Sequence, residues 1–352
     1  MEENTQTVHA PDTKEDDQTI LEIHDLKTYF HLDEGILKAV DGVDLTIKRG
    51  KTLGIVGESG SGKSVATKSI LQIVDPPGKV EGEIKLKRSR KGKEEWIDIG
   101  KLNPTGEKIR DIRGAEISMI FQEPMKAFSS IHTIGNQITE AILIHSEVDQ
   151  EEAKRIAIDF LIKVGMSNPE QRFDQYPHEL SGGMRQRAMI AMALCCNPAI
   201  LIADEPTTAL DVTVQAQVLD LINHLKETLD TSVIFITHDL GVIAEMSDEV
   251  AVMYLGKVIE YTDVETLFYG ALHPYTQALL KSIPSVAHTK GELDSIKGTV
   301  PIPMNLPKGC GFYSRCKYAV NGVCNVDDIP FTKVNDNHYV RCVRLDEIEN
   351  RG

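Results

Sequence analysis

The chain has 352 residues, 41% hydrophobic and 26% charged, a composition typical of globular proteins. Its formal net charge of −15 argues against a protein that binds nucleic acid by neutralising phosphates with a basic surface. No run of about 18 apolar residues occurs, so a membrane-spanning helix is not predicted.

The N-terminal region combines a polar tail with strand patterns. Residues 1–19 are acidic, lack the basic and apolar regions of a secretory signal, and predict a disordered tail. Residues 21–30 and 37–50 alternate in a way that favours antiparallel strands. Residues 81–113 are dense in charge, contain the only tryptophan, Trp96, and indicate a surface hairpin extension.

Four short apolar runs, rich in β-branched residues, predict buried strands of a parallel sheet. They are residues 52–57, 117–122, 199–204 and 232–237. Each ends at a polar position, and the carboxyl ends of parallel strands gather ligands at one edge of a sheet. The fold class predicted is therefore α/β, with these strand ends forming one site.

Helical patterns lie between and after these strands. Residues 134–195 have helical periodicity, interrupted near residues 166–180, and predict an inserted helical subdomain. Residues 218–229 predict another amphipathic helix. From about Pro274 the content of Pro, Gly and Ser rises, which predicts irregular structure leading into a cysteine cluster.

The first glycine-rich motif follows a predicted strand and opens a predicted helix. It consists of Gly57, Glu58, Ser59, Gly60, Ser61, Gly62, Lys63 and Ser64, with Val65 next. The spacing matches G-x-x-x-x-G-K-[ST], in which backbone N–H groups and the helix N-terminus surround phosphates. Lys63 is expected to reach the β- and γ-phosphates of ATP, and the Ser64 hydroxyl to ligate Mg²⁺.

Polar residues at the other strand ends complete the predicted chemistry. Asp204 is expected to hold Mg²⁺ through water, and Glu205 to orient and deprotonate the attacking water. His238 is expected to contact the γ-phosphate, and Gln122 to sense Mg²⁺ or water. An acidic pair can also simply cap a strand, but the phosphate motif upstream favours catalysis.

A second glycine-rich motif, LSGGMRQR, begins at Leu180 and contains no lysine. Ser181, Gly182, Gly183 and Met184 open a helix whose dipole and free N–H groups favour an anion, with Ser181 as the N-cap. A simple capped helix is the alternative. Because Lys63 and Ser181 are expected to serve different nucleotides, the sequence predicts dependence on a second ATPase.

These motifs, in this order, resemble those of ABC-transporter ATPase subunits. The matching features are Walker A (57–64), the Q-loop residue Gln122, the signature (180–187), Walker B (201–205), the D-loop (209–211, with Asp211) and the H-loop residue His238. The resemblance implies an ABC ATPase domain over residues 20–270. It also implies that an aromatic residue stacks on adenine, either Phe30 or its neighbour Tyr29.

Residues 273–284 and the cysteines after them resemble the C-terminal extension (271–352) of the oligopeptide/dipeptide importer subfamily. The resemblance implies a peripheral subunit on the cytoplasmic side of the membrane. Its partners would be a second, related ATPase, two permease subunits and, indirectly, an extracellular solute-binding protein. Nickel or oligosaccharide import is the nearest alternative. A soluble ABC ATPase acting on ribosomes or DNA is disfavoured, since no heptad array or second cassette occurs.

The segment after Gln122 departs from the subfamily. It reads EPMKAFSSIHTIG (123–135), where relatives have a stretch like DPMTSLNP. This segment normally faces the permease, so the departure leaves the permease and the solute open.

Six cysteines are present, and four are in the last part of the chain: Cys310, Cys316, Cys324 and Cys342. Their spacing, C-x5-C-x7-C-x17-C, lacks the close pairs of structural zinc sites. Spacing alone leaves zinc and iron–sulfur open, and the subfamily resemblance implies a [4Fe–4S] cluster. A structural brace is the expected role, with a redox switch as the alternative. Cys195 and Cys196 fit small buried side chains in a helix.

Overall fold

The computed structural model describes residues 18–90, 93–208, 210–283, 296, 298–304, 306 and 308–349. The chain folds as two compact units. The first unit comprises Met1–Ile47, Leu53–Lys101 and Thr237–Gly352, and the second comprises Lys48–Thr52 and Leu102–Ile236. Residues 1–17 of the predicted tail lie outside the described residues.

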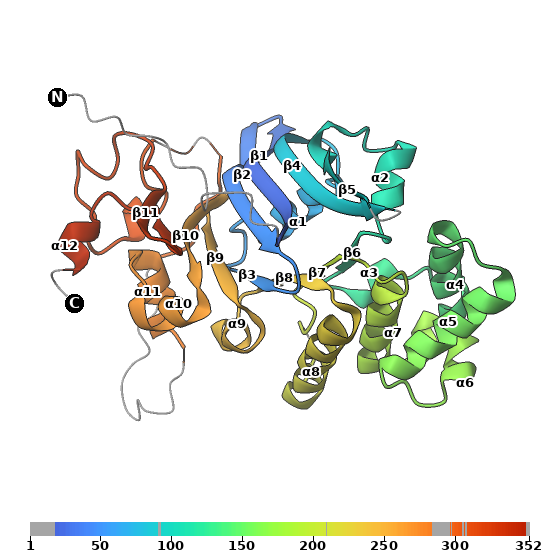
Figure 1. The fold of residues 1–352 in the computed structure, drawn as a ribbon. Helices are drawn as coiled ribbons and strands as arrows, with labels where there is room; N and C mark the ends of the chain where they lie inside the picture. Colours follow the sequence, from blue (N-terminus) through green and yellow to red (C-terminus); the bar gives the residue numbers. More distant parts are fainter. Residues whose placement is uncertain are drawn as a thin grey trace. The chain divides into compact units, whose positions relative to one another are not determined.

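Four antiparallel strands of the first unit form a sheet in the order β2-β1-β4-β5 (Figure 1). Their bounds are Thr19–Leu32 (β1), Gly35–Lys48 (β2), Gly78–Arg90 (β4) and Lys93–Asp98 (β5). Leu21 and Ile23 are fully buried, and Leu21 lies opposite Leu86 of β4. The antiparallel strands predicted from alternation are confirmed, and β4 and β5 form a hairpin within residues 81–113.

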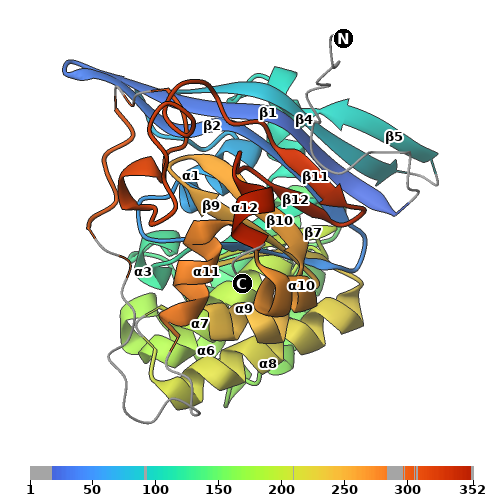
Figure 2. The same ribbon diagram turned by 90° about the vertical axis from the view of Figure 1, so that its left-hand side faces the viewer.

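Five further strands of the first unit are hydrogen-bonded in the order β11-β12-β10-β9-β3. Figure 2 shows four of them, β11, β12, β10 and β9. Their bounds are Thr52–Val56 (β3), Glu249–Tyr254 (β9), Lys257–Asp263 (β10), Thr332–Asn335 (β11) and His338–Val340 (β12). β3 runs parallel to β9, with Ile55 opposite Ala251, and the other pairs are antiparallel. This arrangement places the phosphate motif directly after a fully buried strand.

The helices of the first unit include several from the C-terminal extension. They are α1 (Lys63–Ile70), η1 (Ile99–Lys101), α9 (Leu240–Met246), α10 (Val264–Gly270), α11 (Pro274–Lys281), η3 (Tyr313–Arg315) and α12 (Leu345–Glu349). The prediction of irregular structure after Pro274 was therefore wrong in part. Strands β11 and β12 are too short for alternation to show, and β12 is stabilised by pairing with β10, where Tyr339 is fully buried.

Three parallel strands of the second unit, in the order β8-β7-β6, are buried along their whole length. Their bounds are Ile117–Ile120 (β6), Ile200–Asp204 (β7) and Ser232–Thr237 (β8). Ile200 pairs with Ile117 on one side and Ser232 on the other. The strands predicted from apolar runs are present, and their carboxyl ends lie at one edge, as parallel pairing requires.

Helices make up the rest of the second unit. They are α2 (Glu107–Ile112), α3 (Pro124–Ala127), α4 (Ile134–His145), α5 (Gln150–Lys163), α6 (Pro169–Phe173), η2 (Pro177–Glu179), α7 (Gly182–Leu194) and α8 (Val212–Leu229). Thr133 and Asp149 cap α4 and α5 by accepting backbone hydrogen bonds. Among the described helices, none combines the length and apolar character that crossing a membrane requires.

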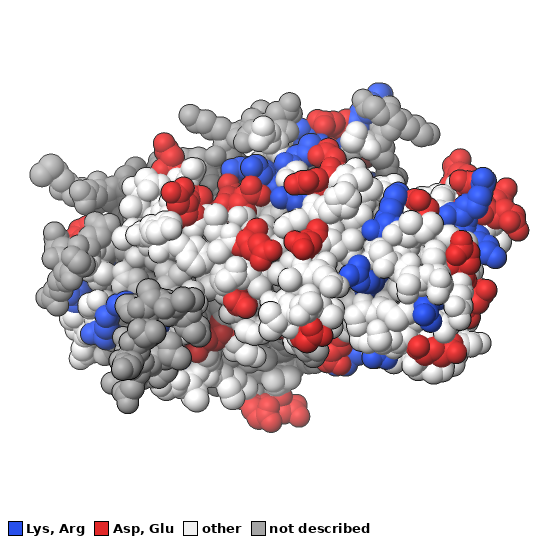
Figure 3. Space-filling model, turned by 90° about the horizontal axis from the view of Figure 1, so that it is seen from below, with Lys and Arg blue, Asp and Glu red and all other residues white. Residues whose placement is uncertain are grey.

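The surface carries charges of both signs. On the face in Figure 3, the described Lys and Arg side chains are interspersed with Asp and Glu and form no continuous basic area.

Candidate nucleotide site

The phosphate motif forms a tight loop between β3 and α1 in the first unit. Gly57, Gly60 and Gly62 have φ values of +158°, +79° and +101°, which side chains rarely adopt. A Cβ on Gly57 would lie 2.2 Å from the Met253 carbonyl oxygen, and one on Gly62 would lie 2.3 Å from that of Ala39. The backbone therefore requires glycine at both positions.

Lys63 is buried at the first residue of α1, and its Nζ donates to loop carbonyls. The acceptors are Gly57 O at 2.7 Å and Glu58 O at 3.1 Å. Gly62, the N-cap, offers no side-chain acceptor, so the first N–H groups of α1 have no capping side chain. Ser59 and Gly60 are exposed, whereas Ser61 is buried and Ser64 and Val65 are half-buried. The loop thus presents backbone donors and an ammonium to an anion.

The two aromatic candidates for adenine lie next to each other on β1. The Tyr29 hydroxyl donates to Asp41, and Lys38 Nζ lies 5.3 Å from the Tyr29 ring centre. Burial and the Asp41 carboxylate raise the pKa of Tyr29. Phe30 shares the opposite strand face with Thr28, whose hydroxyl lies 2.7 Å from Ser69 Oγ of α1. Phe30 is therefore on the face that meets the helix following the phosphate loop.

Two acidic residues lie at the carboxyl end of β7 in the second unit. Asp204 is the last residue of the strand and is 3% exposed. Glu205 has a left-handed backbone, with φ at +45°. Its Oε2 accepts hydrogen bonds from Gln122 Nε2 at 3.0 Å and from Thr208 Oγ1 at 2.9 Å. The structure brings together two predicted residues, Gln122 and Glu205, that are 83 positions apart.

Thr208 was missed by sequence reasoning. Its signal was its position three residues after Glu205 in a tight turn, where Thr208 N also donates to Glu205 O. Together, Gln122 Nε2 and Thr208 Oγ1 donate to the Glu205 carboxylate and fix its orientation, as a general base needs.

The second glycine-rich motif opens α7, and Ser181 caps it as predicted. Ser181 Oγ accepts from Met184 N at 3.4 Å. Ser181 and Gly182 are exposed, and a Cβ added to Gly182 would meet no atom of the described residues within 4 Å. A Cβ on Gly183 would lie 3.2 Å from Val214 of α8. The tip of the motif is thus open to a ligand from outside the chain.

The remaining predicted residues lie at the starts of helices. Asp211 caps α8 by accepting from Thr213 N and Val214 N, at 3.1 and 3.0 Å. His238 follows β8 and is exposed, next to Asp239, which caps α9. The first residue of the D-loop, at position 209, lies outside the described residues.

All four C-terminal cysteines line one small cavity of about 20 Å³. They are Cys310, Cys316, Cys324 and Cys342, and no disulfide joins them. Burial raises the pKa of Cys310 to about 12 and that of Cys342 to about 11. Within the described residues, no three His, Cys, Asp or Glu side chains are placed to hold a single metal ion. The thiols therefore surround a common space without forming a compact single-ion site.

Two residues of the extension contact the phosphate loop, and sequence reasoning missed both. The Tyr275 hydroxyl accepts from Glu58 N at 2.8 Å, and Arg315 donates to the Glu58 carboxylate at 2.7 and 3.0 Å. These partners are 217 and 257 positions away in the sequence, so spacing gave no signal.

Comparison with protein families identifies two regions. A family of ABC transporters matches residues 40–208, and the C-terminal region of oligopeptide/dipeptide transporters matches residues 259–324. The second match includes Tyr275 and three of the four clustered cysteines, while Cys342 lies beyond it.

Individual proteins are similar over nearly the whole chain. The oligopeptide transport ATP-binding protein AppD of Bacillus subtilis (strain 168) is 47% identical over 331 residues, which cover 94% of this chain and 98% of AppD. The dipeptide transport ATP-binding protein DppD of Escherichia coli (strain K12) is 41% identical over 323 residues, covering 92% and 96%.

Among solved structures, the dimeric, post-hydrolysis ATP-binding cassette MJ0796, bound to ADP and Pi, has a TM-score of 0.59 and 26% identity. It covers 70% of this chain and 99% of its own. This similarity confirms the predicted α/β cassette with its antiparallel sheet.

Proposed function

This chain belongs to the ABC transporter family, among its oligopeptide and dipeptide transport ATP-binding proteins, and from that membership we propose how its residues act. The chain hydrolyses ATP to power the import of oligopeptides or dipeptides. Sequence similarity to AppD and DppD along nearly the whole chain supports this function. Permease partners supply the path through the membrane in this proposal.

The phosphate loop binds the triphosphate of ATP in this proposal. The backbone N–H groups of residues 57–65 and the Lys63 ammonium neutralise the β- and γ-phosphates. Phe30 stacks on adenine, since it faces the helix side of β1, and Tyr29 is the second candidate. To bind phosphate, Lys63 exchanges its bonds to the Gly57 and Glu58 carbonyls for bonds to phosphate oxygens.

Magnesium fits the oxygen donors that the motifs provide, a hydroxyl at Ser64, an amide at Gln122 and a carboxylate at Asp204. When bound, Mg²⁺ neutralises charge on the β- and γ-phosphates. The buried Asp204 carboxylate acts through a bound water, and the amide of Gln122 serves both the metal region and Glu205.

Glu205 is the general base, and its two side-chain hydrogen bonds are the observation that carries this assignment. Gln122 and Thr208 hold the carboxylate in one orientation by donating to its Oε2. The oriented carboxylate takes the proton of the attacking water. His238 contacts the γ-phosphate.

Replacing Glu205 tests the catalytic assignment. In the assembled transporter, Glu205→Gln keeps the shape but cannot accept a proton, so kcat should fall at least a hundredfold. ATP affinity should be retained. Glu227→Gln, on the exposed side of α8, is the matched control and should hydrolyse ATP like the wild type. Undiminished steady-state hydrolysis by Glu205→Gln would disprove the assignment.

The exposed signature motif supports a proposal about the second ATPase. We propose that Ser181, Gly182, Gly183 and Met184 contact ATP held by a second ABC ATPase, a paralogue of this chain, with Asp211 near the same interface. Two permease subunits and an extracellular solute-binding protein complete the importer, and the ATPase lies on the cytoplasmic side. We also propose that the ABC ATPase domain spans residues 20–270 and that the C-terminal extension spans residues 271–352.

Iron–sulfur ligation is proposed for the cysteine cavity. Single-ion zinc sites hold sulfur at about 2.3 Å from the metal, which requires four sulfurs packed around one point. The support in the structure is that all four thiols line one cavity. Four thiolates are the ligands that a [4Fe–4S] cluster uses, and the bound group would brace the extension.

Anaerobic purification tests this site. The wild-type chain should absorb near 400 nm and contain about four irons per chain. Cys316→Ser should lose both signals, whereas Cys195→Ser, at the C-cap of α7, should retain them. A colourless protein loaded with zinc would contradict the cluster.

A further inference from the structure

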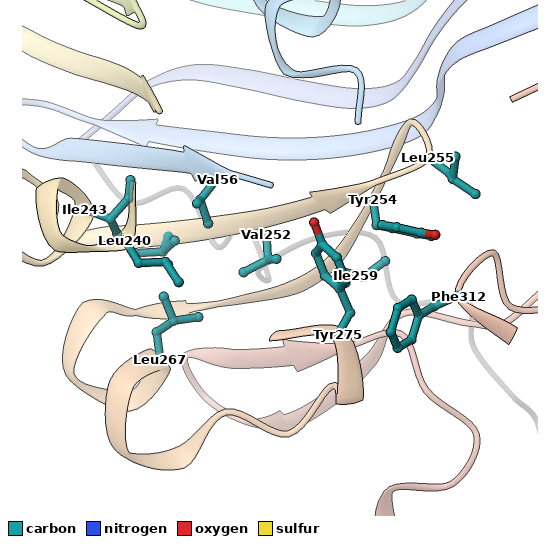
Figure 4. Close-up of a cluster of buried hydrophobic side chains, with 11 residues drawn as sticks. Val56, Leu240, Ile243, Val252, Tyr254, Leu255, Ile259, Leu267, Tyr275 and Phe312 are labelled. Carbon is teal, nitrogen blue, oxygen red and sulfur yellow. The ribbon is translucent and has the colours of Figure 1, made fainter. Parts of the chain in front are cut away.

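The phosphate loop is held from outside by the C-terminal extension at one residue, Glu58. Its backbone N–H donates to the Tyr275 hydroxyl at 2.8 Å. Tyr275 is fully buried, and its ring packs with those of Tyr254 and Phe312 in a cluster of three, with centroids 4.7 and 5.4 Å away (Figure 4). This close packing leaves the hydroxyl little freedom to move, so it fixes the position of the loop at this residue.

The Glu58 side chain is held as firmly as its backbone. Arg315 Nη1 and Nη2 donate to the two carboxylate oxygens at 2.7 and 3.0 Å. Such forked pairs fix orientation as well as distance. The Arg315 side chain is only 4% exposed, also donates to the Tyr254 hydroxyl, and lies against the rings of Tyr254 and Phe312. Its hydrogen bonds to the Glu58 carboxylate raise the already high pKa of Arg315, so the guanidinium stays charged.

The third polar group of Glu58 connects these contacts to the nucleotide chemistry. Its carbonyl oxygen accepts from Lys63 Nζ at 3.1 Å and from Ser61 N at 3.2 Å. Any shift of Glu58 therefore moves an acceptor of Lys63 and a backbone donor of the loop together. The hydrogen bonds that Tyr275 and Arg315 make to the loop within the described residues are to Glu58.

We propose that Arg315 and Tyr275 are positioning residues for ATP binding, holding the phosphate loop in its binding conformation through Glu58. The proposal rests on the loop's assignment as the ATP site. A loop fixed before binding loses less conformational entropy when ATP binds, so affinity rises without new contacts to the nucleotide. The extension, besides any role in transport assembly, then contributes to nucleotide affinity.

The rival explanation is that the Glu58–Arg315 ion pair only anchors the extension and has no effect on ATP binding. Single and double substitutions of these two residues distinguish the two explanations. Glu58→Gln leaves the buried Arg315 charge unpaired and should lower Tm. Arg315→Met keeps the side-chain volume and removes the fork. The double variant has no unpaired charge, so its Tm should recover toward that of the wild type.

The decisive measurement is the Kd of ATP for the full-length chain, beside Tm. Each single variant should raise the Kd of ATP roughly tenfold. The double variant should keep this raised Kd although its Tm recovers. Arg315→Lys keeps the charge but cannot make the forked pair, so its Kd for ATP should lie between those of the wild type and Arg315→Met. Tyr275→Phe should also raise the Kd of ATP while preserving the aromatic packing.

Two controls have comparable burial but lie off the loop. Arg341→Gln removes a buried arginine of the same extension that donates to Val258 O and Ile329 O. Tyr261→Phe removes a buried hydroxyl bonded to Glu249. Both should lower Tm and leave the Kd of ATP unchanged.

Recovery of ATP affinity together with Tm in the double variant would overturn the proposal, as would an unchanged Kd in Arg315→Met and Tyr275→Phe. Failure of the ATP assignment itself appears separately, as a wild-type chain that does not bind ATP.

Discussion

His273, the residue before α11, shows how one buried side chain makes stability depend on pH. Its Nδ1 accepts from Tyr275 N at 3.0 Å, which requires a neutral ring with no proton on that nitrogen. Burial lowers the pKa of His273 to about 4, although the nearby Glu260 carboxylate opposes this. The cap that starts α11, and with it the placement of Tyr275, is thus lost when the ring is protonated.

The sign of the effect follows from proton binding. Between about pH 6.5 and pH 4 the unfolded chain binds a proton here that the folded chain does not, so acidification lowers the free energy of unfolding. The loss is about 1.4 kcal/mol per pH unit from this group, about 3 kcal/mol in all, and it levels off below pH 4. Above pH 6.5 the contribution is constant.

Denaturant unfolding of His273→Asn across this range checks the prediction. Asn can cap the helix but does not titrate, so the variant's free energy should fall with pH less steeply than the wild type's. His224→Asn, in an exposed part of α8, should follow the wild-type profile. Parallel profiles for wild type and His273→Asn would exclude this histidine as the source.

At this scale, what the sequence predicts depends on local spacing. The phosphate loop and the Ser181 cap need only neighbours within a few residues, so motif and propensity suffice. Tyr275 and Arg315 reach Glu58 across 217 and 257 positions, and only the folded chain reveals them. The motif containing Tyr275 identified the subfamily but gave no physical role for the hydroxyl.

At the scale of elements, long patterns were predicted and short ones were not. The buried strands β3, β6, β7 and β8 were predicted because an apolar run carries the signal by itself. β11 and β12 have four and three residues, which is too few to show alternation. They form because β10 offers a strand edge, a condition that no local pattern contains.

The element after β6 presents apolar side chains to solvent. Within residues 123–135, around α3, Met125 is 44% and Ile131 is 77% exposed. Exposed apolar residues beside the Q-loop fit the permease-facing role expected of this segment. Ile131→Glu should weaken association with the permease subunits roughly tenfold and leave the Kd of ATP unchanged.

Co-purification of the variant with its permeases measures this effect. Ile144→Glu, which places the same charge on an isoleucine of α4 that is 66% exposed, is the control. Equal recovery of permeases with Ile131→Glu and Ile144→Glu would place the contact elsewhere.

At the scale of the whole molecule, the chain carries a signature motif whose tip is exposed among the residues that the structure describes. Gly182 is exposed and has open space where a Cβ would be, so Gly182→Asp should leave Tm and the chain's own Kd for ATP unchanged. In the assembled transporter the new carboxylate would meet phosphate bound by the second ATPase, and like charges in contact repel. Steady-state hydrolysis should then fall more than tenfold.

The matched substitution is Gly270→Asp at the end of α10, where an added Cβ makes only an ordinary contact 3.7 Å from Thr266. It should hydrolyse ATP at the wild-type rate. If Gly182→Asp weakened ATP binding by the isolated chain, the motif would serve the chain's own nucleotide, and the need for a second ATPase would lose its basis. Loss of turnover with intact binding instead locates the defect in a nucleotide held by another subunit.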